Sequence, residues 1–266
     1  MIIKNSQELE ILREGGKLLA SILHKVADVT KPGTTTKQID KLAEDLIRKT
    51  GGEPSFKGYS VHGAPMPYPA SLCVSINNEI VHGIPSDRIL KESDVVGLDI
   101  GMQYKGYFTD VAETILVKSK ELDSLSQRRV SMNYLEIERL IATTKSALEV
   151  GISEVRTGSH VGDIGFVIQR HLEDGGFGVI RELVGHGVGR AVHEDPEIPN
   201  WGEKGNGYVL HEGEVIALEP MATVGNHAAK LLSDGWTWAT KDGSIAAHFE
   251  HTMVVTKNGC EVLTKI

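Results

Sequence analysis

The chain has 266 residues, 40% of them hydrophobic and 24% charged, and its formal net charge is -8. This composition predicts a soluble globular protein of one large domain or two modest ones. The acidic balance argues against direct nucleic-acid binding, and two cysteines are too few for a disulfide framework. No apolar run reaches the length of a membrane span, so we expect neither membrane insertion nor export, and a cytoplasmic location.

The first half of the chain predicts two helices followed by strands. Residues 6–29 place leucines on one helical face, and Asn5 with Glu8 forms a candidate capping box. A second helix is expected over 36–50, followed by a loop rich in proline and glycine over 54–69. Strands are then expected at 71–76, 80–82, 95–103 and 107–117, the last two joined as a hairpin by Lys105-Gly106.

The second half repeats this order. Helices are predicted over about 125–150 and 164–173, followed by strands near 179–184, 214–218 and 249–256. Two helices followed by strands, twice over, favour a duplicated α+β unit. No linker of distinct composition separates the halves. We therefore expect a single domain over 1–266 with pseudo-symmetric halves of about 1–120 and 121–266.

A local repeat supports this duplication. Residues 94–99 and 214–219 both read as an acid, two β-branched residues, a small residue, leucine and an acid. A second acid follows each copy, Asp110 after the first and Glu250 after the second.

These acids predict a metal site together with His186, which lies between glycines. Strand alternation puts Asp99 on one face with apolar or small neighbours, and the hairpin brings it close to Asp110. A carboxylate inside a β core is costly unless something neutralises it. Four carboxylates and one imidazole suit two divalent cations of the transition-metal type. The alternative is that each acid is solvated at a strand end or belongs to a buried ion pair.

Several motifs together resemble the methionine aminopeptidases, in the same order over essentially the whole chain. They are Asn77–Pro85, Leu98–Gly101, Tyr107–Asp110, Gly185–Gly189, Ala217–Met221, Asp234–Thr237 and Phe249–Thr252. The resemblance implies the pita-bread fold, an α+β fold in which pseudo-twofold duplicated helices pack on curved antiparallel sheets. The short spacing between His186 and Glu219 resembles the type I enzymes.

The resemblance also implies roles for individual residues. Two divalent ions (Co, Mn, Fe or Zn) would be bound by Asp99, Asp110, His186, Glu219 and Glu250, with Asp110 and Glu250 bridging them. Glu219 would shuttle a proton, His82 would contact the scissile amide nitrogen, and His193 would stabilise the oxyanion. The methionine pocket would be built by Tyr59, Tyr68, Cys73 and Trp236.

The implied activity is removal of the initiator methionine when the second residue is small. The implied partners are the N-termini of nascent peptides, at the ribosome, although no segment specifies docking there. The family is typically monomeric. Two alternatives stay open: a peptidase of the Xaa-Pro aminopeptidase or prolidase kind, and a non-catalytic pita-bread binding module.

The sequence departs from the family pattern at four places. The stretch Tyr59–Pro69 is longer than the common family loop. Phe56 stands where many relatives have cysteine, and Val192 where many have phenylalanine. His248 stands where glutamine is common and is two residues from Glu250, so a supporting role beside that ligand is one alternative, but we expect its side chain to face solvent.

Overall fold

The computed structural model describes residues 1–118 and 132–266. Its helices are α1 (Ser6–Val29), α2 (Thr36–Lys49), α4 (Met132–Glu154) and α5 (Val161–Asp174). Its first strands are β1 (Glu53–Pro54), β2 (Cys73–Ile76), β3 (Glu79–Val81), β4 (Val95–Tyr104) and β5 (Tyr107–Leu116). Those after α5 are β6 (Gly178–Val179), β7 (Gly185–Gly187), β8 (Glu194–Ile198), β9 (Val215–Leu218), β10 (Met221–Thr223), β11 (Ala229–Leu231), β12 (Trp238–Thr240), β13 (Ala246–His248), β14 (Glu250–Thr256) and β15 (Gly259–Val262).

The largest sheet has nine strands and draws on both halves of the chain. Its main order is β1-β4-β5-β14-β9-β7-β8, with β2 added to β4 and β15 to β14. The predicted hairpin is confirmed, since Tyr104 pairs with Tyr107 across Lys105-Gly106. The halves meet where β5 of the first pairs with β14 of the second.

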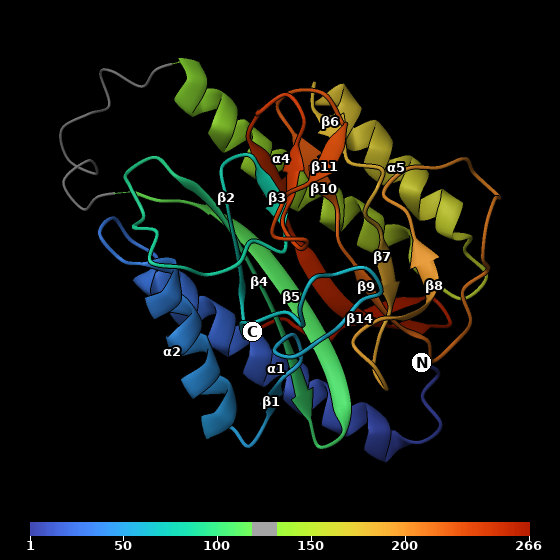
Figure 1. The fold of residues 1–266 in the computed structure, drawn as a ribbon. Coiled ribbons are helices and arrows are strands. Elements are labelled where there is room, and N and C mark those ends of the chain that lie inside the picture. Colours follow the sequence, from blue (N-terminus) through green and yellow to red (C-terminus); the bar gives the residue numbers. More distant parts are fainter. Residues whose placement is uncertain (119–131) are drawn as a thin grey trace.

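Each pair of helices packs mainly against the strands of its own half, although Leu12 of α1 also packs with apolar residues of the second half. One apolar core lies between α1, α2 and strands β2, β4 and β5. The other joins α4 and α5 to strands of the second half, among them β9 and β14. In Figure 1 the two helix pairs lie at opposite ends of the view, with the long strands β4 and β5 between them. Among the described residues, no helix is long and apolar enough to cross a membrane.

Helices α1 and α2 each begin where a side chain accepts a hydrogen bond from a backbone N–H of the first turn. The Asn5 side chain accepts a hydrogen bond from the Glu8 N–H, but the Glu8 carboxylate accepts from Lys4, so only half of the predicted capping box forms. At α2, Thr35 and Gln38 form a complete box. The predicted helix over 125–150 is observed from Met132, and its expected first residues lie outside the described part of the chain.

The strand predicted over 179–184 is wrong for most of its length. Only Gly178–Val179 forms a strand, paired with β10. Ile180 is buried and still donates its N–H to Met221, but Arg181 and Glu182 turn outward into solvent. The charged pair in the middle of this segment interrupts its apolar residues, and without alternation the segment does not specify a strand.

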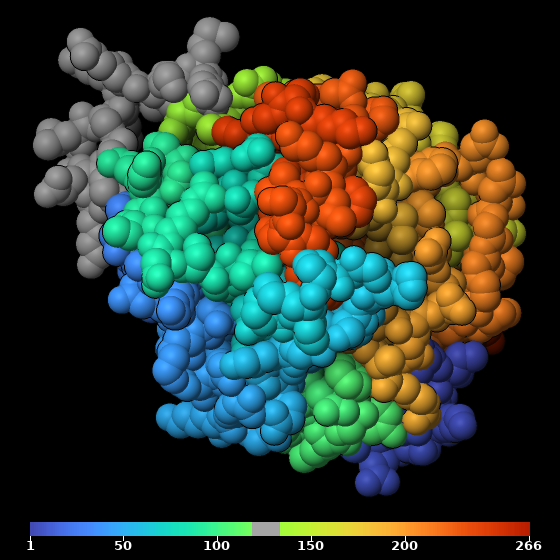
Figure 2. All heavy atoms as spheres, viewed as in Figure 1, coloured from blue at the N-terminus to red at the C-terminus, as the bar shows by residue number. Residues whose placement is uncertain are grey.

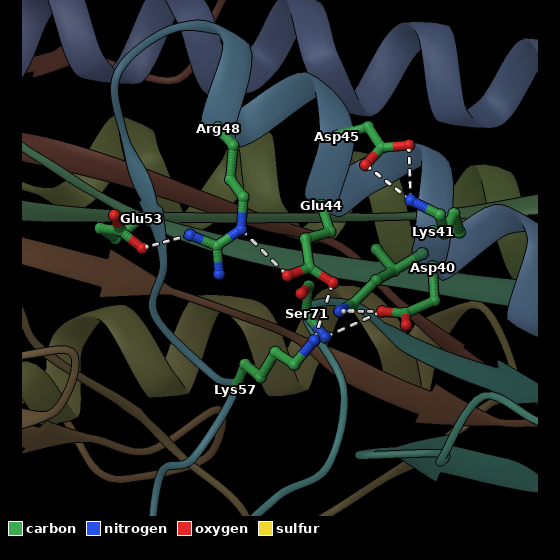
Figure 3. Close-up of polar contacts among 9 residues, drawn as sticks. Asp40, Lys41, Glu44, Asp45, Arg48, Glu53, Lys57 and Ser71 are labelled. Atoms are coloured by element: carbon green, nitrogen blue, oxygen red, sulfur yellow. Dashed lines mark hydrogen bonds and ion pairs between the residues drawn. The ribbon is translucent and has the colours of Figure 1, made fainter.

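Helix α2 holds both ends of the long loop between β1 and β2 (Figure 3). At the start of the loop, Lys57 Nζ lies 2.8 Å from Glu44 Oε2. At its end, Asp40 Oδ1 accepts the N–H groups of Ser71 and Leu72 at 2.8 and 3.0 Å. Two fixed ends restrict the paths that the intervening residues can take.

Candidate metal centre

The five predicted donors lie on five neighbouring strands of the large sheet. Strands β4, β5, β14, β9 and β7 follow one another in the sheet and bring, in that order, Asp99, Asp110, Glu250, Glu219 and His186. Glu219 directly follows the last residue of β9, and the other four lie within their strands. Figure 1 shows these strands side by side across the middle of the fold. Residues up to 151 positions apart in the sequence thus face one site.

Register puts the first two carboxylates on the same face. Asp99 pairs with Ala112, and Asp110 pairs with Gly101, so the two acids lie diagonally across the hairpin. Glu250 also pairs with Ala112, from the opposite neighbour of β5. Alternation within the paired strands therefore sends all three side chains to one side.

Hydroxyl and amide groups fix the backbone beneath the acids. The Asp110 N–H donates to Thr252 Oγ1, and that hydroxyl donates to the Asp110 carbonyl, both at 2.8 Å. Asn200 Nδ2 donates to the Glu219 carbonyl at 3.0 Å. These contacts engage backbone atoms of the two acids, and of the Asp110 carboxylate only Oδ1 also accepts a backbone N–H, that of Val111 at 3.0 Å.

His186 presents one ring nitrogen to the acids. Its Nδ1 lies 2.9 Å from the Gly187 carbonyl, which can only accept, so Nδ1 carries the proton. Nε2 is then unprotonated and lies 3.7 Å from Glu219 Oε1 and 3.9 Å from Glu250 Oε1. Burial lowers the pKa of His186 to about 3, which keeps the ring neutral. This is the tautomer that a metal-binding imidazole needs.

Without a cation the four acids repel one another and are poorly solvated. Burial raises the pKa of all four, and for Asp99, Asp110 and Glu250 the charge of the neighbouring carboxylates raises it further. Asp99 Oδ1 is buried and has no hydrogen-bond partner among the described residues. Donor atoms of Asp110, His186 and Glu250 lie within 4.8 Å of one another. Buried anions, an orphaned oxygen and a ligating tautomer together fit divalent cations.

A cavity of about 110 Å³ opens beside these donors. It is lined by the carboxylates and by a cluster of aromatic and apolar side chains. All four predicted pocket residues, Tyr59, Tyr68, Cys73 and Trp236, lie on its wall. Because a water molecule takes roughly 30 Å³, the space suits a few waters or one slender side chain.

The two predicted substrate-handling histidines also line this cavity. His82 adopts a left-handed backbone conformation with φ 59°, and a Cβ on the following Gly83 would collide with the Val74 carbonyl. Burial lowers the pKa of His82 to about 4, so its ring is neutral near pH 7. His193 lies next to His186, with ring centroids 4.5 Å apart, and its Nδ1 lies 2.8 Å from the Tyr59 hydroxyl.

The expectation that His248 faces solvent is wrong. The side chain is buried, and its Nε2 lies 3.3 Å from Glu219 Oε2. Thr114 fixes its backbone, since the Thr114 hydroxyl accepts from the His248 N–H and donates to its carbonyl. The available signal was its spacing of two from Glu250, which places both residues on one face of an extended segment.

Two further lining residues had no predicted role. Phe56 and Val61 both contribute to the cavity wall. Val192 packs into the same aromatic cluster as Tyr68 and Trp236. Phe56 and Val192 were visible as departures from the family pattern, whereas Val61 lies in a loop whose position the local sequence does not specify.

Comparison with known proteins gives one consistent result. Residues 10–257 match the model of metallopeptidase family M24. The chain is 41% identical over 266 residues to a methionine aminopeptidase of Clostridium perfringens, covering 100% of this chain and 99% of that one. It is 40% identical to methionine aminopeptidase 1 of Bacillus subtilis, with both chains fully covered. A crystal structure of methionine aminopeptidase from Thermotoga maritima superposes with a TM-score of 0.90, at 40% identity and full coverage of both chains.

Proposed function

Because this chain belongs to the methionine aminopeptidases of metallopeptidase family M24, we propose that its cavity takes the first residue of a peptide whose second residue is small. The chain is a metal-dependent hydrolase that removes the N-terminal methionine, and nascent chains are the substrates that this activity implies. Its fold is the pita-bread fold, as predicted. The observation that carries the proposal is the row of five donors beside a cavity that aromatic and apolar side chains also line.

The residues that would hold two divalent cations are Asp99, Asp110, His186, Glu219 and Glu250. When bound, the cations would act as Lewis acids and lower the pKa of a water molecule. Glu219 would accept the proton that the attacking water loses and pass it to the departing amine nitrogen. Its position beside the cavity and its raised pKa both suit this role.

The neutral histidines would orient the scissile amide. The Tyr59 hydroxyl lies 2.8 Å from His193 Nδ1 and would donate to it; the proton of the ring would then be on Nε2, which can donate to the developing oxyanion. His82 would hydrogen-bond the amide nitrogen from the same cavity wall. The pKa of both rings is lowered, that of His82 by burial and that of the partly exposed His193 by desolvation from the residues around it, so both rings are neutral near pH 7.

The apolar end of the cavity suits methionine. Tyr68 and Trp236 meet edge to face, with ring centroids 5.3 Å apart, and Cys73 is buried beside them. An unbranched thioether makes favourable contacts with aromatic edges and adapts to a narrow space. The free α-amine would lie toward the carboxylates, which explains removal of a terminal residue.

The whole chain would act as one catalytic unit, because the donors come from both halves of the sheet. We further propose a monomer in the cytoplasm that acts on chains as they leave the ribosome, since its substrates are nascent. A non-catalytic binding module would not need to retain all five donors.

The test compares two peptides with metal-free protein. Mn²⁺, Fe²⁺ or Co²⁺ is added, and methionine release from Met-Gly-Met-Met is measured beside cleavage of a peptide with proline in second position. We expect release from the first peptide only, and only with metal. Failure with every metal would overturn the proposal, and preferential cleavage before proline would favour a prolidase-like enzyme. A chelator added at the end controls for metal dependence.

A further inference from the structure

The unusually long loop at the cavity forms a closed flap, which we define as residues 60–67. The residues on either side of it pair with each other at its base. Tyr68 donates its N–H to the Tyr59 carbonyl, and Gly58 donates to the Tyr68 carbonyl, both at 2.8 Å. Helix α2 holds the chain just outside this pair, through Glu44 on one side and Asp40 on the other (Figure 3). The flap therefore starts from a fixed base.

The tip of the flap rests on the second half of the chain. Trp236 Nε1 donates to the Met66 carbonyl at 2.9 Å. Pro65 packs so closely on Gly235 that a Cβ there would collide with the proline ring, and Gly235 has φ 77°. In Figure 2 the light-blue and cyan segment that includes the flap lies against the orange-red segment of the second half. Contacts at base and tip together fix where the flap lies.

Val61 is the flap residue that faces the cavity. Its side chain lines the same space as the carboxylates, yet it is 44% exposed. The other described lining residues are buried or half-buried, with the exception of His193. Val61 and His193 therefore mark the mouth of the cavity, where it meets solvent.

A peptide bound for methionine removal must pass this mouth. Its first residue lies inside, with the amine toward the carboxylates and the side chain in the aromatic end. The rest of the chain continues into solvent, so the second residue crosses the mouth. We propose that Val61 limits the size of that second residue and thereby determines specificity; this inference rests on the proposed function.

The chemistry of Val61 suits a fixed wall. A β-branched side chain has few χ1 rotamers, so it cannot swing aside as leucine or methionine can. The flap around it is held at base and tip, which limits backbone movement as an alternative. A bulky second residue would therefore meet a side chain that has few ways to rotate aside, on a backbone that is held on both sides.

The experiment measures kcat/KM for Met-Gly-Met-Met, Met-Ala-Met-Met and Met-Val-Met-Met with the Mn²⁺-loaded protein. We expect Val61→Ala to raise kcat/KM for the valine peptide relative to the glycine peptide by about tenfold, because it removes bulk at the mouth. We expect Val61→Phe to lower kcat/KM for Met-Ala-Met-Met relative to the glycine peptide by about tenfold. Val209→Ala is the matched control, an exposed valine outside the cavity that should leave both ratios unchanged.

Each outcome decides the proposal. Ratios that stay within about twofold of the parent in both variants would overturn it, as would equal changes for all peptides, which would place Val61 at the first residue instead. Circular dichroism establishes that the variants fold, and if Val61→Phe does not, Val61→Ala decides alone. Methionine release by the parent from the glycine peptide tests the proposed function separately.

Discussion

Glu219 lies between two histidines, one beside each carboxylate oxygen. His186 Nε2 lies 3.7 Å from Oε1, and His248 Nε2 lies 3.3 Å from Oε2. Burial lowers the pKa of both rings to about 3, so near pH 7 neither supplies a positive charge. Burial in turn raises the pKa of Glu219 to about 8. Its ionisation therefore depends on a cation, and this makes Glu219 the most informative single residue to alter.

Glu219→Gln keeps the shape of the side chain but removes its charge and its basicity. We expect kcat on Met-Gly-Met-Met to fall by about 10²–10⁴-fold at saturating Mn²⁺, the range typical of a lost general base. Glu212→Gln, in an exposed turn, serves as the control. Steady-state kinetics measure both variants. Turnover equal to the parent's in Glu219→Gln would remove this residue from the mechanism.

His248 touches no predicted substrate group, so we expect it to act through Glu219. His248→Leu removes the nitrogen that lies beside Glu219 Oε2 and puts an apolar side chain in its place. Losing such an outer partner typically costs about 10–100-fold in metal affinity. Isothermal titration with Mn²⁺ measures this directly. His248→Gln restores a polar group there and should bind Mn²⁺ nearly as the parent does; equal affinity for both variants would show that the nitrogen has no such role.

At the scale of elements, α2 positions the cavity wall through Asp40. Its carboxylate is largely buried and accepts two backbone N–H groups at the start of β2. Asp40→Ala would leave those N–H groups unsatisfied, and we expect a loss of about 1–3 kcal/mol in the free energy of unfolding. Urea denaturation gives the value. Asp45→Ala on the exposed side of the same helix removes only a surface ion pair with Lys41 and should cost less than about 1 kcal/mol (Figure 3). Equal losses in the two variants would contradict this account.

Elements with a strong pattern were predictable from sequence, and most of the shortest ones were not. The leucine stripe of α1 specifies a helix, and the run of β-branched and apolar residues that leads to Asp99 indicates a buried strand. The short strand expected at 80–82 is observed as β3, but β8 and the other strands of the two small sheets have two to five residues, too few to carry a period. The repeat of acids indicated which residues belong together, and the resemblance indicated His82 and His193.

What sequence could not indicate depends on tertiary contacts. His248 is buried because β13 passes behind Glu219, and Val61 lines the cavity because the flap rests on Trp236. The spacing of His248 from Glu250 indicates a shared face but not burial, and the contact of the flap with Trp236 leaves no local pattern in the residues that make it. The place of Val61 can be recognised only in the folded chain, where Met66 contacts Trp236 from about 170 residues away in the sequence.

At the scale of the whole molecule, the site lies where the two halves join. Asp110 on β5 and Glu250 on β14 face each other across that junction, and Thr252 hydrogen-bonds the backbone of Asp110 there. Repulsion between buried acids thus acts directly on the contact between halves. Cation binding should for this reason change global stability as well as activity.

Stability of the metal-free protein should consequently fall as pH rises from 6.5 to 8. A carboxyl whose pKa is raised by folding binds more protons in the folded state than in the unfolded state, so the free energy of unfolding decreases as pH rises through the folded-state pKa. Burial raises the pKa of Asp110 to about 7 and that of Glu219 to about 8. Below pH 6.5 the buried neutral histidines act oppositely, because unfolding lets them take up protons, and this sets the lower limit of the window. Each such proton contributes at most about 1.4 kcal/mol per pH unit.

Thermal unfolding in a chelator across this window measures the effect. Mn²⁺ at 100 times its Kd should add about 2.7 kcal/mol and should reverse the trend, because cation binding favours the ionised carboxylates that higher pH supplies. Glu219→Gln removes one of the titrating groups and should flatten the metal-free profile. A melting temperature that stays constant or rises between pH 6.5 and 8 without metal would contradict the view that these carboxyls hold protons in the folded protein, and with it the electrostatic reason for two cations at the junction.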